Sequence, residues 1–220
     1  MAFRDGCSLP KAPRNATLEY YQAMRDTCLK PAWAAATKSK GINYPGYTIT
    51  VQAPGADSGN EKCGGVTDTK TGFYCDSDHR IFIFNDWKGD WQWFVDNDPA
   101  FAHARLLAHE DAHYEQLAVF GMGPIVAELE SRDRKQGVHT TSRRLEMQAE
   151  CIAQAQLIGA PGPSAIGPQG RSILSSSEGY RSDDSHGDGA KTAGWVNNGF
   201  KSGGELRQCN TWAAPRDWIE

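Results

Sequence analysis

The pattern HExxH, two histidines four residues apart with a glutamate after the first, occurs once, as His109, Glu110 and His113. On a helix this spacing places both imidazoles on one face, where a single cation can bind both. Zinc suits neutral imidazole, and Glu110 can take a proton from a metal-bound water and pass it to a leaving amine. The pattern therefore predicts an enzyme that hydrolyses amide bonds with one catalytic Zn²⁺ ion. The alternative is two surface histidines on a solvated helix face.

A catalytic zinc ion needs a third protein ligand, and here a carboxylate is the natural choice. No histidine follows Gly at the spacing of the HExxHxxGxxH class. Glu146 and Glu150 are also four residues apart, so one can bind zinc while the other reaches the distal N–H of a ligand histidine. We predict Glu146 as the third metal ligand and Glu150 as the carboxylate that orients His109. The alternative for either is a salt bridge with Arg143 or Arg144.

Hydrolysis through a tetrahedral intermediate also needs a hydrogen-bond donor for the developing oxyanion. His186, in the polar loop 182–187, is our candidate, with Asp183 or Asp184 orienting its ring. The alternative is an ordinary histidine of a surface loop. Tyr114 follows the second ligand and could also donate to the oxyanion, but such a neighbour is more often a packing residue.

The remaining histidines and a run of aromatic residues carry weaker signals. Three histidines have no comparable partners and are predicted to be ordinary surface or boundary residues: His79, His103 and His139. Aromatic residues before a helix are more often part of the core than of a substrate groove. We therefore predict core positions for four aromatic residues that could otherwise line a groove: Trp87, Trp91, Trp93 and Phe94.

Two predicted helices must position these residues. Asp98, as N-cap before a proline, and an unbroken run to Gly121 predict a helix over 101–120, which contains the HExxH pattern. A second helix is predicted over 142–158, with Thr141 or Ser142 as its cap and Gly159 as its stop. It carries Glu146 and Glu150.

The other predicted elements are a helix over 17–38 capped by Thr17, a strand at 47–51, and a last short helix at 191–201. Residues 73–74 and 80–84 read as two strands of a hairpin joined by the turn 76–78.

These elements predict an α+β fold in which a small mixed or antiparallel sheet packs on the HExxH helix and a helical lobe follows. We expect a single domain over 1–220, with lobes at about 1–120 and 121–220. Substrate would lie between the lobes, as an extended peptide along an edge strand near Ile81 to Phe84.

The charge and cysteine content narrow the class of protein. A net charge of −4 with scattered Lys and Arg argues against nucleic acid as a partner. The six cysteines form no CxxC pair, which favours disulfides over thiolate zinc sites. Sequence order suggests the pairs Cys7–Cys28, Cys63–Cys75 and Cys151–Cys209, the last of which would pin the Glu146 helix to the C-terminal segment.

Stable disulfides indicate an oxidising, extracytoplasmic compartment, with the protein secreted or anchored to a membrane. Residues 1–10 contain no apolar signal region and the chain has no transmembrane stretch, so we expect an export signal or membrane anchor outside this sequence. The alternative is a cytosolic protein with six free thiols.

Several segments resemble the bacterial family described as putative neutral zinc metallopeptidases. They are AHEDAH at 108–113, LEMQAEC at 145–151, and a C-terminal part in which His186-Gly187 precedes Trp195, Gly199-Phe200 and Cys209. The resemblance covers most of 60–212 and implies a zincin-like fold, a zinc cofactor and peptide or protein substrates.

Two positions depart from the family's pattern: its usual Asp is Glu150 here, and its usual His after the second ligand is Tyr114. The longer Glu150 could shift its contact with a ligand histidine or compete with Glu146 for the metal. Two other functions remain open. One is a binding or assembly module that keeps the fold without proteolysis, and the other is a zinc amidase that acts on cell-wall peptides.

Overall fold

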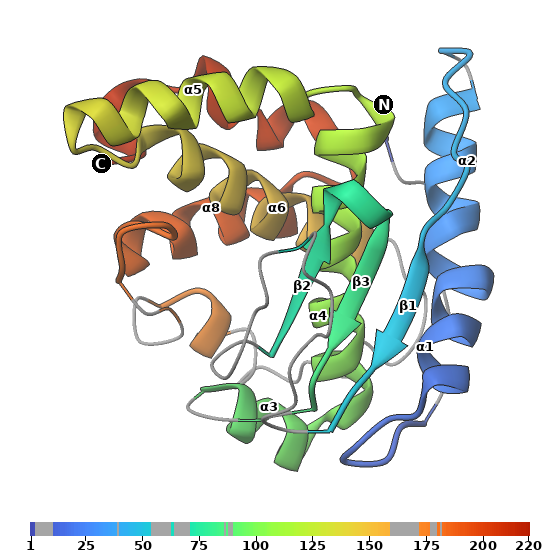
Figure 1. Ribbon diagram of the computed structural model, residues 1–220. Coiled ribbons are helices and arrows are strands. Elements are labelled where there is room, and N and C mark those ends of the chain that lie inside the picture. The colour runs from blue at the N-terminus through green and yellow to red at the C-terminus, as the bar shows by residue number, and fades with distance from the viewer. Residues whose placement is uncertain are drawn as a thin grey trace.

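The computed structural model describes residues 1–2, 11–38, 40–53, 63, 71–85, 87, 90–158, 172–176, 180 and 182–220. Helices dominate and a three-stranded sheet lies among them (Figure 1), so the fold is α+β as predicted. The elements are α1 (Leu18–Met24), α2 (Lys30–Lys38), β1 (Thr48–Val51), β2 (Gly72–Cys75), β3 (Arg80–Ile83), α3 (Asp90–Asn97), α4 (Pro99–Tyr114), α5 (Gly123–Gln136), α6 (Thr140–Ile158) and α8 (Gly189–Lys201).

The sheet has the order β1-β3-β2, with β1 parallel and β2 antiparallel to β3. The hairpin prediction is confirmed, but the prediction that Ile81 to Phe84 form an edge strand is wrong. All four of these side chains are buried, and a continuous apolar run is typical of a central strand. The edges of the sheet are β1 and β2, and β2 contacts α4.

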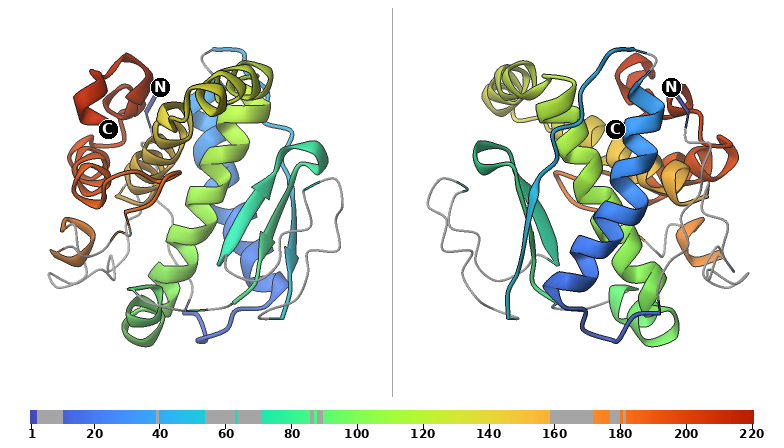
Figure 2. Two further views of the ribbon diagram at one scale, coloured as in Figure 1. Left: turned by 60° about the vertical axis from the view of Figure 1, so that its left-hand side comes forward. Right: turned by 90° about the vertical axis from the view of Figure 1, so that its right-hand side faces the viewer.

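Helix α4 lies at the centre of the protein, between the sheet on one side and α6 on the other (Figure 2, left). Asp98 caps it by accepting a hydrogen bond from the N–H of Phe101, and Pro99 is its first residue, as the sequence predicts. A π-helical turn, Glu115–Val119, continues it to Phe120. Most of its side chains are buried, so α4 presents both the face that carries His109 and His113 and its opposite face to other elements.

Helix α6 begins at Thr140, two residues before the predicted start. Thr141 and Ser142 therefore lie in its first turn, and the prediction that one of them is the cap is wrong. Asp133, near the end of α5, accepts a hydrogen bond from the backbone N–H of Thr141 at 2.6 Å. A carboxylate from the preceding helix thus satisfies a donor that a local cap would otherwise bind.

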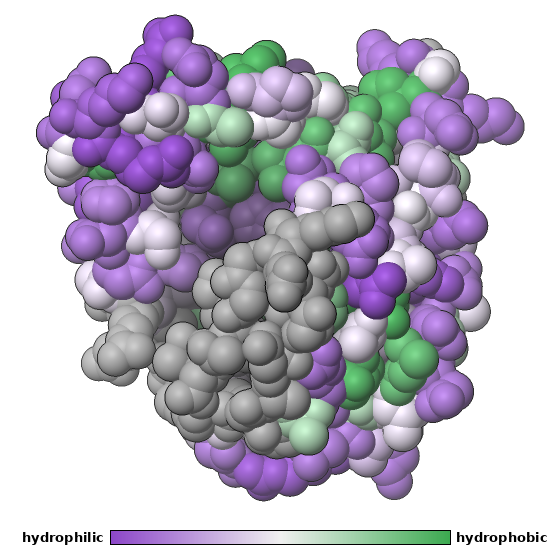
Figure 3. All heavy atoms as spheres, viewed as in Figure 1, coloured by the Kyte–Doolittle hydropathy of each residue, from purple (hydrophilic) through white to green (hydrophobic). Residues whose placement is uncertain are grey.

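The outer helices follow local signals. Thr17 caps α1 by accepting from the N–H of Tyr20, and α1 continues through the π-helical turn Arg25–Leu29 into α2, which together match the predicted helix. Asp188 caps α8, which begins two residues before the predicted start. Hydrophilic side chains cover much of the outer surface of α5 (Figure 3). No helix in the described part of the chain is long and apolar enough to cross a membrane.

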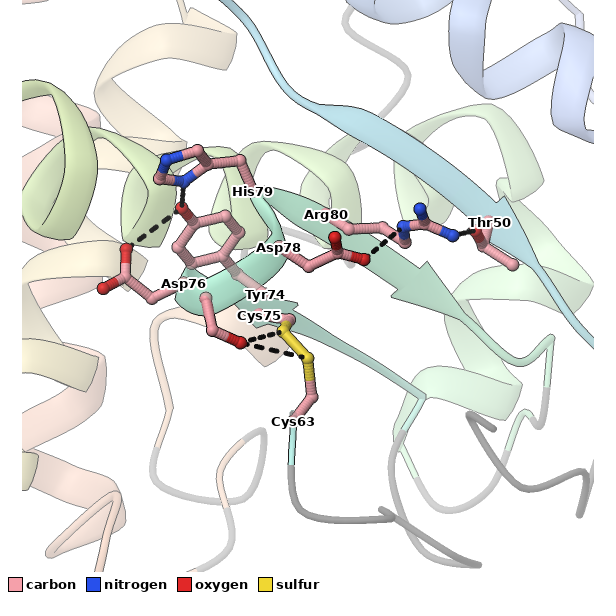
Figure 4. Close-up of a disulfide and its surroundings, with 9 residues drawn as sticks. Thr50, Cys63, Tyr74, Cys75, Asp76, Asp78, His79 and Arg80 are labelled. Carbon is pink, nitrogen blue, oxygen red and sulfur yellow. Dashed lines mark hydrogen bonds and ion pairs between the residues drawn. A yellow bond between two sulfur atoms is a disulfide. The ribbon is translucent and has the colours of Figure 1, made fainter. Parts of the chain in front are cut away.

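Two of the three predicted disulfides are present. The Cα atoms of Cys63 and Cys75 are 5.7 Å apart, and those of Cys151 and Cys209 are 5.5 Å apart. The first lies at the end of β2, beside the turn that leads into β3 (Figure 4). The predicted pair Cys7–Cys28 cannot be assigned, because Cys7 lies outside the described residues.

His103 is buried, so the prediction that it is a surface or boundary residue is wrong. Its Nδ1 is 2.7 Å from the Tyr21 hydroxyl and its Nε2 is 3.0 Å from the carbonyl of Pro13. The carbonyl can only accept, so Nε2 carries the proton and Nδ1 accepts from the tyrosine. His79 is exposed and bonds the Tyr74 hydroxyl (Figure 4). The predicted aromatic run packs in or against the hydrophobic core.

Candidate metal centre

The HExxH pattern and the paired glutamates meet where α4 crosses α6. His109 and His113 come from one face of α4, and their Nε2 atoms are 3.2 Å apart. Oε2 of Glu146, from α6, lies 3.3 Å from His109 Nε2 and 3.2 Å from His113 Nε2. These three residues can hold a metal ion.

The spacing of the three donor atoms fits zinc. A tetrahedral zinc site with ligand bonds of about 2.0–2.1 Å places its ligand atoms about 3.3–3.4 Å from one another. The three observed separations of 3.2, 3.2 and 3.3 Å agree with that value. Two imidazoles and one carboxylate are also a donor set that catalytic zinc sites use, with a fourth position left open.

The opposite nitrogen of His113 is held by Gln116, a residue that the sequence analysis missed. His113 Nδ1 is 2.9 Å from Gln116 Oε1, and Gln116 Nε2 donates to the carbonyl of Leu145 at 3.0 Å. The donation to Leu145 fixes which end of the amide faces the histidine. Nδ1 therefore carries the proton, and the lone pair of Nε2 is left for a metal. Gln116 lies three residues after His113 on the same helix face, which is the signal that could have identified it.

The opposite nitrogen of His109 faces Glu150, whose Oε1 is 3.5 Å from His109 Nδ1. The same oxygen accepts from Arg105 Nη2 at 2.9 Å. Arg143 and Arg144, the alternative partners of the two glutamates, bind backbone carbonyls instead.

Electrostatics around these groups favour ionised carboxylates. Burial raises the pKa of Glu150, but the charges of Arg105 and His109 outweigh it and lower the pKa below its usual value. Burial likewise raises the pKa of Glu146, and the two histidines bring it well below the usual range. Burial lowers the pKa of His109, while Glu146, Glu150 and Glu110 raise it to about 9. A cation is thus favoured among these carboxylates, which is the condition that a bound metal ion meets.

His186 reaches the same site from the loop before α8. Its Nε2 is 3.6 Å from Glu146 Oε2, and its Nδ1 is 3.0 Å from both carboxylate oxygens of Asp183. Burial raises the pKa of Asp183, but the backbone N–H of His186 and the imidazole lower it. Asp183, rather than Asp184, is therefore the residue that orients the ring.

The loop that carries His186 is closed by hydrogen bonds in both directions between the backbones of Asp183 and Gly187. Gly187 has φ of +78°, and a Cβ there would lie 2.9 Å from Met147 Cε and 3.1 Å from Arg143 Cδ. Glycine adopts this backbone conformation without strain, and its lack of a Cβ leaves room for the side chains of α6. The loop is thereby docked on the helix that supplies Glu146.

The opposite face of α4 anchors the helix. Asp111 accepts hydrogen bonds from Trp33 Nε1 at 2.8 Å and the Tyr44 hydroxyl at 2.7 Å, and burial raises its pKa to about 6. Tyr114 is buried among aromatic rings, and its hydroxyl accepts from the N–H of Gly46. Tyr114 is thus a packing residue, as predicted. Glu110 is 5% exposed and lies on α4 directly after His109.

Comparison with known proteins identifies a family to which this chain belongs. The sequence model of the family described as "Putative neutral zinc metallopeptidase" matches residues 23–157. The chain belongs to this family. It is also 30% identical over 166 residues to two proteins named "Uncharacterized protein YpfJ", from Escherichia coli K12 and from Escherichia coli O6:H1. The match covers 68% of this chain and 56% of each relative, so the chain spans little more than half of their length. No solved structure matches.

Proposed function

We propose that this protein is a zinc-dependent peptidase in which His109, His113 and Glu146 hold the metal and Glu110 is the general base. The observation that carries the proposal is the convergence of three donor atoms at 3.2–3.3 Å from one another. The Nδ1 atom of each histidine faces a side-chain oxygen, of Glu150 or of Gln116. Such partners orient ligand histidines in metalloenzymes.

When bound, a zinc ion supplies a Lewis acid that polarises a carbonyl and lowers the pKa of a water ligand to about 7. Glu110 accepts the proton of the attacking water and delivers it to the leaving amine. His186, with Nδ1 donating to Asp183, presents Nε2 to the site and in its protonated form donates to the developing oxyanion. Family membership supports peptides or proteins as the substrate class.

The substrate binds, in this proposal, as an extended peptide along β2. The central strand β3 has neighbours on both sides, whereas β2 pairs only with β3 among the described strands and contacts α4. Backbone hydrogen bonds to an edge strand align an extended peptide without demanding a particular sequence. The zincin-like arrangement of edge strand, metal helix and third-ligand helix is part of this proposal. Two disulfides support an extracytoplasmic location.

The proposal is tested by elemental analysis and casein hydrolysis on the same preparations. We expect about one zinc per chain and chelator-sensitive cleavage in the parent. The His113→Ala variant is expected to lose the metal, because only two ligands remain. The Glu110→Gln variant is the matched control, since it is expected to keep the metal and lose cleavage.

The alternative functions give different results in this experiment. Zinc binding with no hydrolysis of casein or of cell-wall peptides would overturn the peptidase proposal in favour of a binding or assembly module. Cleavage confined to cell-wall peptides would identify a zinc amidase. A parent protein without zinc would overturn the assignment of the ligands.

A further inference from the structure

Arg105 is a buried cation on the metal-binding helix, and the mechanism proposed above does not use it. Its side chain is 4% exposed, and it precedes His109 by one helical turn. Residues four apart lie on the same face of a helix. Burying a guanidinium is unfavourable unless a carboxylate and hydrogen bonds compensate for the lost water. An arginine at this position therefore needs a partner, and the structure provides one.

The partner is Glu150 of α6, which connects Arg105 to His109. One carboxylate oxygen, Oε1, accepts from Arg105 Nη2 at 2.9 Å and faces His109 Nδ1 at 3.5 Å. A guanidinium and an imidazole from successive turns of α4 thus converge on one atom of the neighbouring helix. Glu150 stands where the resemblance noted above places an aspartate, and its additional methylene extends the carboxylate toward α4.

Aromatic rings hold the guanidinium of Arg105 in place. Its Cζ lies 4.5 Å from the ring centre of Trp91 and 5.4 Å from that of Tyr180, with Phe94 at 6.0 Å. Contacts of this kind fix a guanidinium that has been removed from water. The cation that binds Glu150 is therefore itself held by residues outside the metal site.

We propose that Arg105 is a positioning residue of the metal centre. Arg105 holds Glu150, and Glu150 orients the ring of His109 so that Nε2 faces the metal. This proposal rests on the proposed function only in that both require a metal ion bound by His109, His113 and Glu146. Gln116 has the corresponding role for His113, but it is neutral. Arg105 also balances the charge of Glu150, so that the carboxylates around the ion are not left without a fixed cation.

The test compares zinc affinity, measured by competition with a chelator, between the parent and Arg105→Met. Loss of a partner that orients a metal ligand weakens metal binding by about 10–100-fold, and we expect a loss of that size. Arg105→Lys keeps the charge and is expected to recover part of the affinity. Arg25→Met is the control, because the side chain of Arg25 is partly buried, at 18% exposed, and donates to the carbonyl of Tyr47 at 2.7 Å on a different part of the structure. Its zinc affinity is expected to equal that of the parent.

A double-mutant cycle separates positioning from a general loss of stability. If Arg105 acts through Glu150, then Arg105→Met adds no further loss of zinc affinity in a Glu150→Gln background. Additive losses, or a dissociation constant for Arg105→Met within about twofold of the parent, would overturn the proposal. Should Arg105→Met not fold, the same cycle is measured with Arg105→Lys.

Affinity is measured without substrate, so the result is independent of peptidase activity. A parent that binds zinc and cleaves nothing would overturn the proposed function and leave this inference standing. A parent that binds no zinc would overturn both.

Discussion

Two glycines of α8 differ sharply in what they allow at the α6–α8 contact. A Cβ on Gly199 would collide with the carbonyl oxygen of Cys151 and lie 2.9 Å from the Cβ of Gln154. A Cβ on Gly194 would meet nothing within 4 Å. Alanine at the first position must therefore push α8 away from α6, whereas alanine at the second only removes a helix-interior glycine.

The expected stabilities follow from these contacts. Overpacking costs about 3 kcal/mol at the upper end of its usual range, and replacing a helical glycine by alanine returns about 1 kcal/mol. We therefore expect Gly199→Ala to lower the free energy of unfolding by about 2 kcal/mol and Gly194→Ala to raise it by about 1 kcal/mol. Because α6 also carries Glu146, Gly199→Ala is expected to weaken zinc binding as well.

The assay is urea denaturation of the parent and both variants in the presence of a chelator, so that bound metal does not contribute to stability. Zinc affinity is then measured separately for each protein. Equal stability of the two variants, or a stable Gly199→Ala protein with the zinc affinity of the parent, would refute the close approach of α6 and α8 and its role in placing Glu146.

Three further outcomes are expected. Gln116→Met is expected to weaken zinc binding by about 10–100-fold in chelator competition, because Nδ1 of His113 loses its acceptor; a Gln116→Met protein with the zinc affinity of the parent would contradict the orienting role. Reduction of Cys151–Cys209, which spans 58 residues, is expected to lower the free energy of unfolding by about 4 kcal/mol on the chain-entropy account, and a Cys209→Ser variant as stable as the parent would contradict it. Burial lowers the pKa of His103 below 6.5 and outweighs the hydrogen bonds to backbone carbonyls, which raise it. Just below pH 6.5 the unfolded chain therefore binds a proton on His103 more readily than the folded protein does. The free energy of unfolding is therefore expected to fall as the pH drops below 6.5, and His103→Gln should flatten this dependence in urea denaturation; an unchanged slope would contradict the assignment.

Most elements could be predicted because their signals are local. Asp98 and Pro99 begin α4, Thr17 begins α1, and the turn at 76–78 joins β2 to β3, each through contacts within a few residues. The start of α6 could not be predicted correctly, because the N–H of Thr141 in its first turn is satisfied by Asp133 from another helix. A signal of that kind is not visible in the residues beside the helix end.

For the candidate metal site, sequence alone determined which residues could share a helix face: His109 with His113, and Glu146 with Glu150. Fixed helical periodicity is sufficient for that step. Only the tertiary structure decided that the two faces meet, that Arg105 rather than Arg143 or Arg144 is the arginine that binds Glu150, and that β3 is central. These facts depend on the packing of α4 against α6 and on strand order, which bring together residues far apart in the chain and leave no periodic pattern in the sequence.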